Sequence, residues 1–389
     1  MIRSRSIQMA LIAMLAAGIV AGRWLARATR ADPQPTTAPG RPSPSEADDR
    51  RKDVPPEVSH AIDQALEWFT ANQEPDGRFS ARKHGGTCSD DCSTALAVAC
   101  YIGAGTLPAG PGKHDQALGR AVKWLLKNRP ANNDWTRGTG HGNGMYTHGI
   151  VTLALVRTYA ATRDKDLLAP TRGAVDVILK AQNQTHGGWR YTSTPRDGDT
   201  SILVWQVVAL AAARDAGLDV PKKTFDLAEK WLVRVGGGKS GGLYGYTGRS
   251  PAPAMVAAGM VSSQLLGHKP TEDRMVESAT YIEGHLPRRT LPNDYYLYHG
   301  TMAARGHGDK LWDKWRPALR RSLVLEQVRG GRLRGSWHPR GPYGRHGGRV
   351  YSTALATLSL QISLPDRKPP AATQPSRPAG GESAAPAEP

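Results

Sequence analysis

Cysteine is scarce in this chain: three of its 389 residues are cysteine, Cys88, Cys92 and Cys100, and all lie in one short stretch. A protein zinc site takes four ligands, or three and a water, and no histidine follows Cys92 closely enough to complete that set locally. A disulfide between Cys88 and Cys92 is therefore the simpler expectation for an exported protein. A metal site, with zinc as the candidate, is the alternative; it would use these two cysteines with Asp90 or Asp91.

Acidic residues are also few: 34 Asp and Glu stand against 51 Lys and Arg, which gives a net charge of +17. Such an excess attracts anionic membrane surfaces, acidic glycans, diphosphates or nucleic acid. No zinc-finger, RNA-recognition or helix-turn-helix pattern accompanies the charge, so we expect no nucleic-acid partner. The basic residues are dispersed, which is typical of a solvated surface; an anionic membrane surface is the partner that we retain.

Long apolar runs are few, and the one near the N-terminus, residues 7–21, directly follows Arg3 and Arg5. Basic residues ahead of such a run indicate export, here to the periplasm or cell envelope. With about 15 apolar residues the run is shorter than the roughly 20 of a spanning helix. Residues 1–31 are thus predicted to be a signal peptide or an N-terminal membrane anchor. Residues 32–56 and 364–389 bury too little apolar surface to fold, and we expect both to be disordered.

Residues 57–363, in contrast, repeat one two-part unit six times, most clearly over residues 173–213. In the first part of each unit apolar residues recur with the helical spacing i, i+3, i+4 and i+7. An aromatic or branched residue anchors this helix at intervals of 56, 54, 53 and 51 residues, at Trp68, Trp124, Ile178, Trp231 and Ile282. A sixth such helix is expected to follow Pro317.

The second part of each unit is apolar all the way round, which is typical of a helix buried on most sides. We expect these helices over residues 94–104, 149–160, 201–213, 254–266, 298–305 and 352–360. Each unit then pairs an amphipathic outer helix with a buried inner one. Six hairpins with no polar capping unit at either end favour a closed ring over an open superhelix. The predicted fold is all-α, a single (α/α)6 toroid with an inner barrel and an outer ring of helices.

Several short motifs carry a resemblance to a known family. They are GGW at 187–189, DGDTS at 197–201, NDYYLYHGT at 293–301, GSW at 335–337 and HGGRVYSTALATLSL at 346–360. In the order Gln, Gly-Trp, buried helix they resemble the prenyltransferase and squalene oxidase repeat family. That family includes terpenoid cyclases and protein prenyltransferase β subunits, and the chain is similar in particular to its envelope-targeted bacterial members without established activity. The resemblance implies the same α/α toroid over residues 57–363.

In a closed ring the loops that enter the inner helices converge on one mouth of the barrel. Polar residues at those N-termini should therefore line a shared cavity, where a helix N-terminus favours negative charge. The cavity-lining candidates are Asp91, Tyr146, His148, Trp189, Asp294, Tyr296 and Tyr351. For Trp189 the alternative is that it plugs the joint between neighbouring units.

Asp197 and Asp199 are the first catalytic candidates. The resemblance implies an aspartate that protonates an alkene or epoxide, as in the DxDD pattern of class II terpene cyclases. Thr200 stands where that pattern has its last aspartate, which weakens this interpretation. Asp199, ahead of Thr200 and Ser201, is alternatively an N-cap of the inner helix, a contribution of about 1 kcal/mol.

His299 is the third catalytic candidate, because it resembles the histidine that binds zinc in the prenyltransferase β subunits. There the zinc ligands also include an aspartate and a cysteine; Asp197 matches the aspartate, but Asp199 stands where the thiolate would be. A buried, hydrogen-bonded role is the alternative for His299 and for His148. Both remain of interest, since an imidazole at a cavity mouth can titrate near neutral pH.

Three functions follow from these features. The first is a terpenoid cyclase-like or prenyltransferase-like envelope protein that binds an isoprenoid or other lipid in the toroid cavity, with or without catalysis. The second is a non-catalytic scaffold or binding protein that has kept the ring. The third is an (α/α)6 glycan-processing enzyme, which would need two suitably placed carboxylates across the cavity. A wide polar groove favours this third function, and a deep apolar pocket excludes it.

Overall fold

Two kinds of helix alternate along the chain, as the repeat predicts. The computed structural model describes residues 54–136, 144–289 and 293–365, and over these residues it contains twelve α-helices. The outer helices are α2 (Pro56–Ala71), α4 (Lys113–Lys127), α6 (Lys165–Ala181), α8 (Lys222–Val235), α10 (Asp273–Glu283) and α12 (Asp309–Glu326). The inner helices are α3 (Asp90–Gly103), α5 (Gly144–Thr162), α7 (Thr200–Asp215), α9 (Pro253–Leu266), α11 (Asp294–His307) and α13 (Gly341–Ile362).

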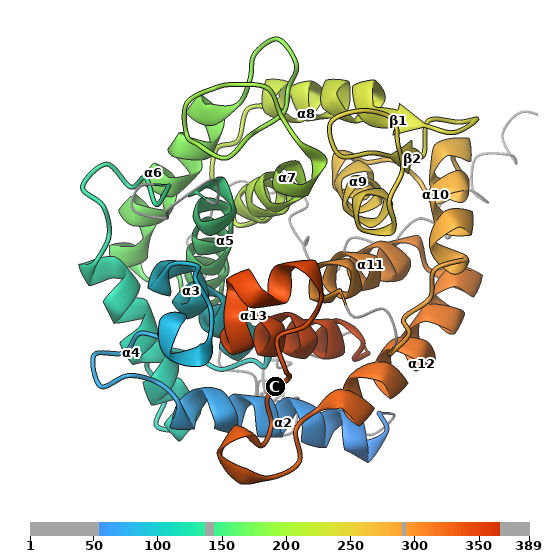
Figure 1. Cartoon of the computed structure of the whole chain (residues 1–389). Helices are drawn as coiled ribbons and strands as arrows, with labels where there is room; N and C mark the ends of the chain where they lie inside the picture. The colour runs from blue at the N-terminus through green and yellow to red at the C-terminus, as the bar shows by residue number, and fades with distance from the viewer. Residues whose placement is uncertain (1–53, 137–143, 290–292, 366–389) are drawn as a thin grey trace, which may run out of the picture.

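The inner helices form a barrel and the outer helices surround it (Figure 1). The ring is closed, because the last inner helix, α13, packs against both α11 and the first inner helix, α3. In the outer ring α12 likewise contacts α2. The expected all-α toroid of six hairpins is therefore confirmed.

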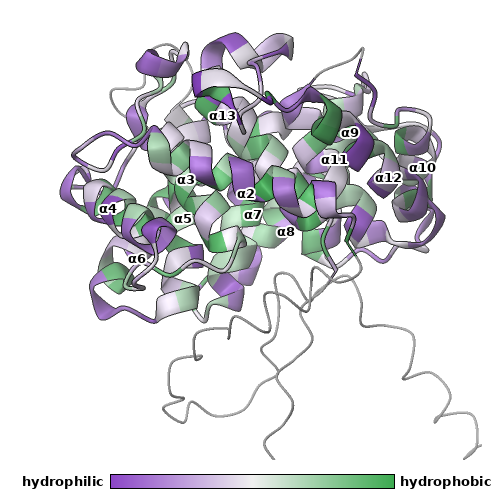
Figure 2. Ribbon diagram, turned by 90° about the horizontal axis from the view of Figure 1, so that it is seen from below, coloured by the Kyte–Doolittle hydropathy of each residue, from purple (hydrophilic) through white to green (hydrophobic). Residues whose placement is uncertain are grey.

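Burial follows the two sequence patterns. In α7 every residue from Thr200 to Ala213 is buried, whereas α4 buries a stripe that includes Leu118, Val122 and Leu125. Figure 2 shows the result: hydrophobic residues gather in the middle of the molecule and hydrophilic ones around its edge. Among the described residues, no helix combines the length and the apolar character needed to cross a membrane. The predicted signal or anchor, residues 1–31, lies outside these residues.

The outer-helix prediction was wrong in one place. The sixth outer helix does not follow Pro317 but begins at Asp309, and Pro317 lies inside it. Proline in a helix removes one backbone hydrogen bond. Burial on one stripe compensates for it, since Leu311, Trp315 and Leu319 recur every four residues and are 0–3% exposed.

All six inner helices begin before the apolar stretch that predicts them, and polar side chains cap three of them, α3, α7 and α11. Asn293 caps α11 through a 3.0 Å hydrogen bond from the Tyr296 amide, and Ser89 caps α3 in the same way. A side-chain oxygen at this position satisfies an amide that the helix leaves unpaired. Asp91, Tyr146 and Asp294 therefore belong to the first turns of inner helices and not to loops.

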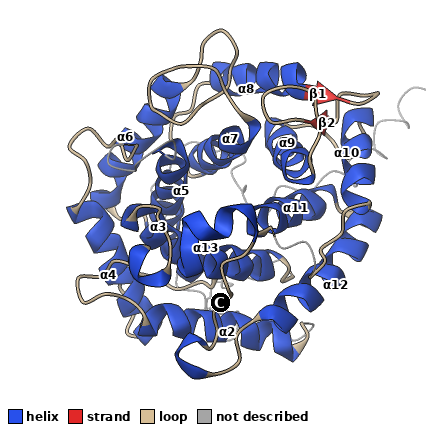
Figure 3. Ribbon diagram, in the orientation of Figure 1, coloured by secondary structure: helices blue, strands red, loops and turns tan. Residues whose placement is uncertain are grey.

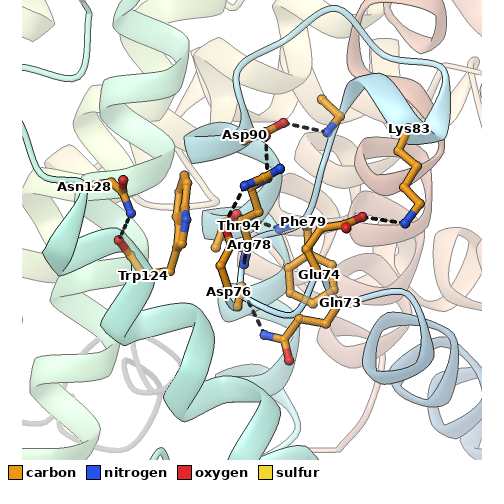
Figure 4. A network of polar contacts seen from close by, with 12 residues as sticks. Gln73, Glu74, Asp76, Arg78, Phe79, Lys83, Asp90, Thr94, Trp124 and Asn128 are labelled. Atoms are coloured by element: carbon orange, nitrogen blue, oxygen red, sulfur yellow. Dashed lines mark hydrogen bonds and ion pairs between the residues drawn. The ribbon is translucent and has the colours of Figure 1, made fainter.

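The recurring glutamine joins each unit to the next. The Gln182 side-chain amide donates to Gly187 O in its own loop and to Thr224 O on the following outer helix, both at 2.9 Å. Gln73 makes the same pair of bonds to Gly77 O and Ala117 O in the first unit (Figure 4). Both acceptors are backbone carbonyls. The contact therefore requires the glutamine side chain but no particular side chain at the two accepting residues.

The Gly-aromatic part of the motif fits the same joint. Gly187 has φ +82° and lies against the Leu227 carbonyl, so a side chain would be strained there and would clash. Trp189, 1% exposed, donates from Nε1 to Ile178 O at 2.8 Å. It therefore plugs the joint between an outer helix and its loop, and does not line the barrel. In the second unit Asn133, with φ +56°, takes the place of the glycine ahead of Trp135.

The fourth joint carries the two strands of the described residues, β1 (Gly236–Gly237) and β2 (Leu243–Tyr244), which pair antiparallel between α8 and α9 (Figure 3). Tyr244, fully buried, fills the position of the plug. Two 3-10 turns, Arg82–His84 and Gly331–Leu333, lie in the loops that lead to α3 and α13.

Candidate functional site

The mouth of the barrel is lined by residues at the starts of the inner helices and in the loops that precede them. At its centre lies Asp199, the N-cap of α7, whose side chain is fully buried. Its Oδ1 accepts hydrogen bonds from the Ile202 amide at 2.8 Å and from Ser201 Oγ at 2.6 Å. Its Oδ2 accepts one from the Tyr246 hydroxyl at 3.3 Å and lies 3.8 Å from Arg190 Nε.

The charge state of Asp199 is set by two opposing effects. Burial raises the pKa of this carboxyl. The hydrogen bonds that it accepts and the positive charge of Arg190 oppose the rise. Asp199 is thus a helix cap with four polar neighbours, one of which, Tyr246, is 37% exposed. The neighbouring Thr200 donates to Gly245 O at 2.6 Å, so it holds the next joint and does not face the site.

Five tyrosines surround Asp199 and define what we call the phenol cluster: Tyr146, Tyr246, Tyr295, Tyr343 and Tyr351. They come from the second, fourth, fifth and sixth units. Tyr146 shares a hydrogen bond with Ser201, and Tyr295, from α11, donates to Ser201 O at 2.9 Å. Burial raises the pKa of all five hydroxyls, and the Asp199 carboxylate adds to the rise at most of them. At neutral pH they are therefore neutral donors and acceptors.

The rim of the cluster is open to solvent. Tyr343 is 40% exposed and packs against Tyr295, with ring centroids 5.6 Å apart. Arg190 lies over the rings of Tyr191 and Tyr246, 4.8 Å and 5.6 Å from their centroids. The mouth thus offers aromatic faces, hydroxyls and one cation.

Two further carboxyls flank α13 at the same end of the barrel. Asp294 begins α11 and accepts a 2.5 Å hydrogen bond from Ser352 Oγ on α13; burial raises its pKa to about 7. Asp91 lies in the first turn of α3, where burial and the neighbouring Asp90 raise its pKa to about 6. Tyr351 of α13 lies near Asp294, whose charge adds to the effect of burial in raising the pKa of the Tyr351 hydroxyl.

Asp197, in contrast, does not belong to the mouth. Its side chain is 52% exposed and forms an ion pair with Arg234 of α8, at 3.1 Å. Tyr296 also faces away from the barrel: its hydroxyl donates to His285 O at 2.7 Å and its ring packs edge-on against Trp315 of α12. The structure therefore separates both from Asp199, Tyr146 and the other candidates.

His148 is a buried packing residue. Its Nε2 donates to Ala174 O at 2.9 Å and its Nδ1 accepts from the Trp135 amide at 3.4 Å. Burial lowers its pKa to about 4, so the ring is neutral under ordinary conditions.

His299 lies deeper in the barrel, below the mouth. Its Nδ1 donates to Tyr295 O at 3.0 Å, and burial lowers its pKa to about 3. Trp205 of α7 packs edge-on against this ring and stacks on Tyr298 of α11, 5.5 Å between centroids. All three side chains are 0–2% exposed. They therefore link α7 to α11 below the phenol cluster.

The expected disulfide is not formed. Cys88 and Cys92 are free thiols, and Cys88 Sγ lies 3.5 Å from Ser93 Oγ and 3.7 Å from Gly347 O, so it is directed into polar contacts. Cys100 is fully buried in the core. Within the described ranges, no three His, Cys, Asp or Glu side chains are grouped so that they could hold a metal ion. The alternative zinc site at Cys88 and Cys92 thus lacks a third ligand there.

Arg190 and Tyr295 belong to the site but are not among the cavity-lining residues predicted from the sequence. Arg190 follows the Gly-Trp plug directly, so its place in the motif was the available signal. Tyr295 lies in the motif at 293–301 beside Asp294, but which of its neighbouring tyrosines points into the barrel depends on the rotation of α11.

No family model and no curated protein matches the chain. Solved structures do: an α-1,6-mannanase from Salegentibacter sp. HEL1_6 has a TM-score of 0.58 at 14% identity, covering 79% of this chain and 98% of that one. A cellobiose 2-epimerase from Spirochaeta thermophila DSM 6192 has a TM-score of 0.52 at 14% identity, covering 84% and 98%. A type II terpene cyclase from Scytonema has a TM-score of 0.50 at 14% identity, covering 79% and 97%. At these identities the likenesses establish the α/α toroid fold that the three proteins share with this chain.

Proposed function

We propose that this protein binds and processes a glycan at the barrel mouth, with Asp294 and Asp91 as the groups that transfer protons. The observation that carries the proposal is the pair of carboxyls on either side of α13 whose pKa values are raised to about 7 and about 6. Near pH 6.5 Asp294 is then more often protonated and Asp91 more often ionised. An acid and a base poised near the working pH are what general acid–base catalysis needs.

The shape of the barrel supports a ligand at the mouth over one along the axis. Trp205, Tyr298 and His299 pack together between α7 and α11 below the phenol cluster, which favours a ligand at the mouth over a long apolar chain at their level. The exposed rings of Tyr343 and Tyr246 provide flat faces for the C–H groups of a sugar ring, and the hydroxyls and Arg190 provide hydrogen bonds.

Two structural neighbours act on carbohydrates by their names, the α-1,6-mannanase and the cellobiose 2-epimerase. An inactive variant of the mannanase carries replacements of two consecutive aspartates. This chain has two consecutive aspartates, Asp90 and Asp91, at the N-terminus of an inner helix. The parallel agrees with a role for Asp91, while Asp90 accepts hydrogen bonds from Ala81 and pairs with Arg78 (Figure 4).

The test is turnover of a panel of neutral and acidic oligosaccharides by the full-length protein, with products identified by mass. Asp294→Asn and Asp91→Asn are each expected to lower the rate by roughly 10²–10⁴-fold. Asp197→Asn is the matched control, because Asp197 faces solvent on the outer side, and it should leave the rate unchanged. Turnover that survives both variants would refute the assignment, and binding without turnover would leave a glycan-binding scaffold.

A second candidate is an isoprenoid ligand, as the repeat family implies. The observation that favours it is the buried Asp199, with a raised pKa, among five tyrosine rings, since π faces stabilise cations. A type II terpene cyclase is also among the structural neighbours. This function requires a short isoprenoid that enters no deeper than Trp205. Retention of a polyprenyl species by the purified protein, and its loss in Asp199→Asn, would select this candidate. Export and contact with an anionic membrane remain predictions.

A further inference from the structure

The connection from α12 to α13 is a strongly basic part of the molecule. From residue 327 to residue 365 the chain has no Asp or Glu, and it has six arginines: Arg329, Arg332, Arg334, Arg340, Arg345 and Arg349. In Figure 1 this connection runs from the outer ring beside α2 to the barrel mouth, where α13 begins. Five of the six arginine side chains are exposed, and Arg349 is half-buried.

Most of these cations are not neutralised within the protein. Among the residues that the structure describes, Arg329, Arg332, Arg334 and Arg345 have no carboxylate partner. Arg340 does, since it lies 3.2 Å from Glu326. Exposed cations that gather on one side of a site without counter-charges create a positive potential there.

We call the six arginines of this connection the strip. A pocket beside Asp294 connects the strip to the proposed site. Its walls include Arg288, Arg340 and His338, together with Asp294, Glu326 and Trp337. Arg288 is exposed and also lacks a carboxylate partner in the described ranges, whereas Glu326 is shared by Arg340 and Arg289. The pocket therefore has a cationic outer wall and, at its inner wall, the carboxyl that we assign to proton transfer.

We propose that the strip and this pocket bind carboxylate groups of an acidic glycan, so that the substrate class is a polyuronate. The inference rests on the proposed function, because it orients a glycan whose other end lies at the phenol cluster. Planar guanidinium groups suit carboxylates, since two N–H donors face two oxygens. Arg345 lies in the same short helical turn as the exposed Tyr343, which places an unpaired cation at the rim of the mouth.

A glycan is favoured over an anionic membrane by the shape of the site. Arg288 and Arg340 line a pocket that also contains Asp294, and a flat bilayer surface contacts exposed side chains only. The other arginines belong to one connected stretch of chain, which runs from the outer ring to the mouth (Figure 1), as an extended polymer requires.

The experiment compares binding of hexagalacturonate with that of its methyl ester, which has the same backbone without charge, to the full-length protein by calorimetry. We expect the ester to bind at least about 10-fold more weakly, and the acid to lose affinity as salt rises. The double variant Arg288→Gln/Arg345→Gln should lose a similar factor for the acid and none for the ester. Arg172→Gln, an exposed arginine on α6 without a partner in the described residues, is the control and should bind like the wild type.

Equal binding of acid and ester would overturn this inference and leave the proposed function intact. If neither hexamer binds but a neutral oligosaccharide is turned over in an Asp294-dependent way, the inference also fails alone. Binding to phosphatidylglycerol vesicles that the double variant abolishes, with no binding of the hexamer, would reassign the strip to a membrane. A melting temperature for each variant shows that any loss of binding is not a loss of fold.

Discussion

At the residue scale, burial decides which titratable groups of this protein are useful near neutral pH. His148 and His299 are buried, and burial outweighs the charge of Asp134 near His148, so their pKa values fall to about 4 and about 3 and they stay neutral. The same burial raises the pKa of Asp91 and Asp294 into the range from about 6 to about 7. The carboxyls of Asp91 and Asp294, and not these two histidines, are therefore the groups that change charge near neutral pH.

The raised pKa of Asp294 makes a prediction for stability. Its native pKa, about 7, lies above that of the unfolded chain, so the native state binds the proton more tightly between about pH 4 and pH 7. The charged Asp294 carboxylate thus destabilises the native state above pH 7. The free energy of unfolding rises as pH falls from about 7 to about 4, because the native carboxyl takes up its proton first. At pH 8 Asp294→Asn should therefore unfold at a higher denaturant concentration than the wild type. Its free energy of unfolding should be larger by a few kcal/mol, at about 1.4 kcal/mol per pKa unit.

The gain should shrink as pH falls and be nearly lost at about pH 4, where Asp294 is protonated in the native state and about half protonated in the unfolded chain. Contributions from Asp91 and the histidines are common to both proteins and cancel in the difference. Urea unfolding from pH 4 to pH 8 measures it, with Asp197→Asn as the comparison. A pH-independent difference for Asp294→Asn would show that the native pKa is not raised.

At the element scale, the glycines of the joints determine how helices approach one another. In α13 the helix is broken at Gly348, which has φ +69°, so Gly341–Gly347 form a separate turn over the mouth. An added Cβ at Gly348 would lie 2.5 Å from the Gly86 amide nitrogen in the loop before α3. The break therefore positions Tyr343 and the loop of Cys88 at once.

Gly348→Ala should accordingly destabilise the protein by more than the roughly 1 kcal/mol of a strained φ alone, since the backbone of residue 86 must also move. Gly330→Ala is the matched control, because Gly330 has φ −143° and nothing lies within 4 Å of an added Cβ. Chemical denaturation of the two variants compares them. Equal stabilities would mean that the break in α13 is not imposed by the contact with Gly86.

At the scale of the whole molecule, closure of the ring is visible in single hydrogen bonds. Gln327, in the last unit, donates to Gly335 O at 2.9 Å and to Ala61 O of the first unit at 2.7 Å. Gln361 of α13 donates to Cys100 O of α3 at 2.8 Å, and so closes the inner barrel in the same way. The last unit thus meets the first through the same contacts that join consecutive units.

Gln327→Ala should therefore cost as much stability as Gln182→Ala, about 1–3 kcal/mol for buried carbonyls left without a donor. In an open superhelix the final glutamine would have no neighbouring unit, and its loss would cost less. Gln184→Ala, which replaces an exposed glutamine whose amide bonds to Gln182 O, is the control. Unfolding free energies near zero for Gln327→Ala, with a large loss for Gln182→Ala, would contradict a closed ring in solution.

The ring was predictable from the sequence because its contacts are backbone-directed and recur with the repeat. Gln73, Gln182 and Gln327 mark the joints, and the apolar inner helices follow from composition. The mouth was predictable as a place, through Asp91, Tyr146, Asp199, Asp294 and Tyr351. The sequence does not predict which side chains face the mouth. Residues at the start of a helix point in all directions, and the rotation of α11 decides whether Tyr295 or Tyr296 points into the barrel. Asp197 was misplaced for the same reason, because neighbouring residues of an extended segment point to opposite sides.

The most direct test of the account is native mass spectrometry of the intact protein after incubation with a mixture of oligosaccharides and geranylgeranyl diphosphate. The account predicts an added mass that matches a saccharide, which weakens in Tyr343→Ala because this exposed ring forms part of the rim. An added mass of the isoprenoid, unaffected by Tyr343→Ala and lost on denaturation, would contradict a glycan at the mouth and place a lipid in the barrel.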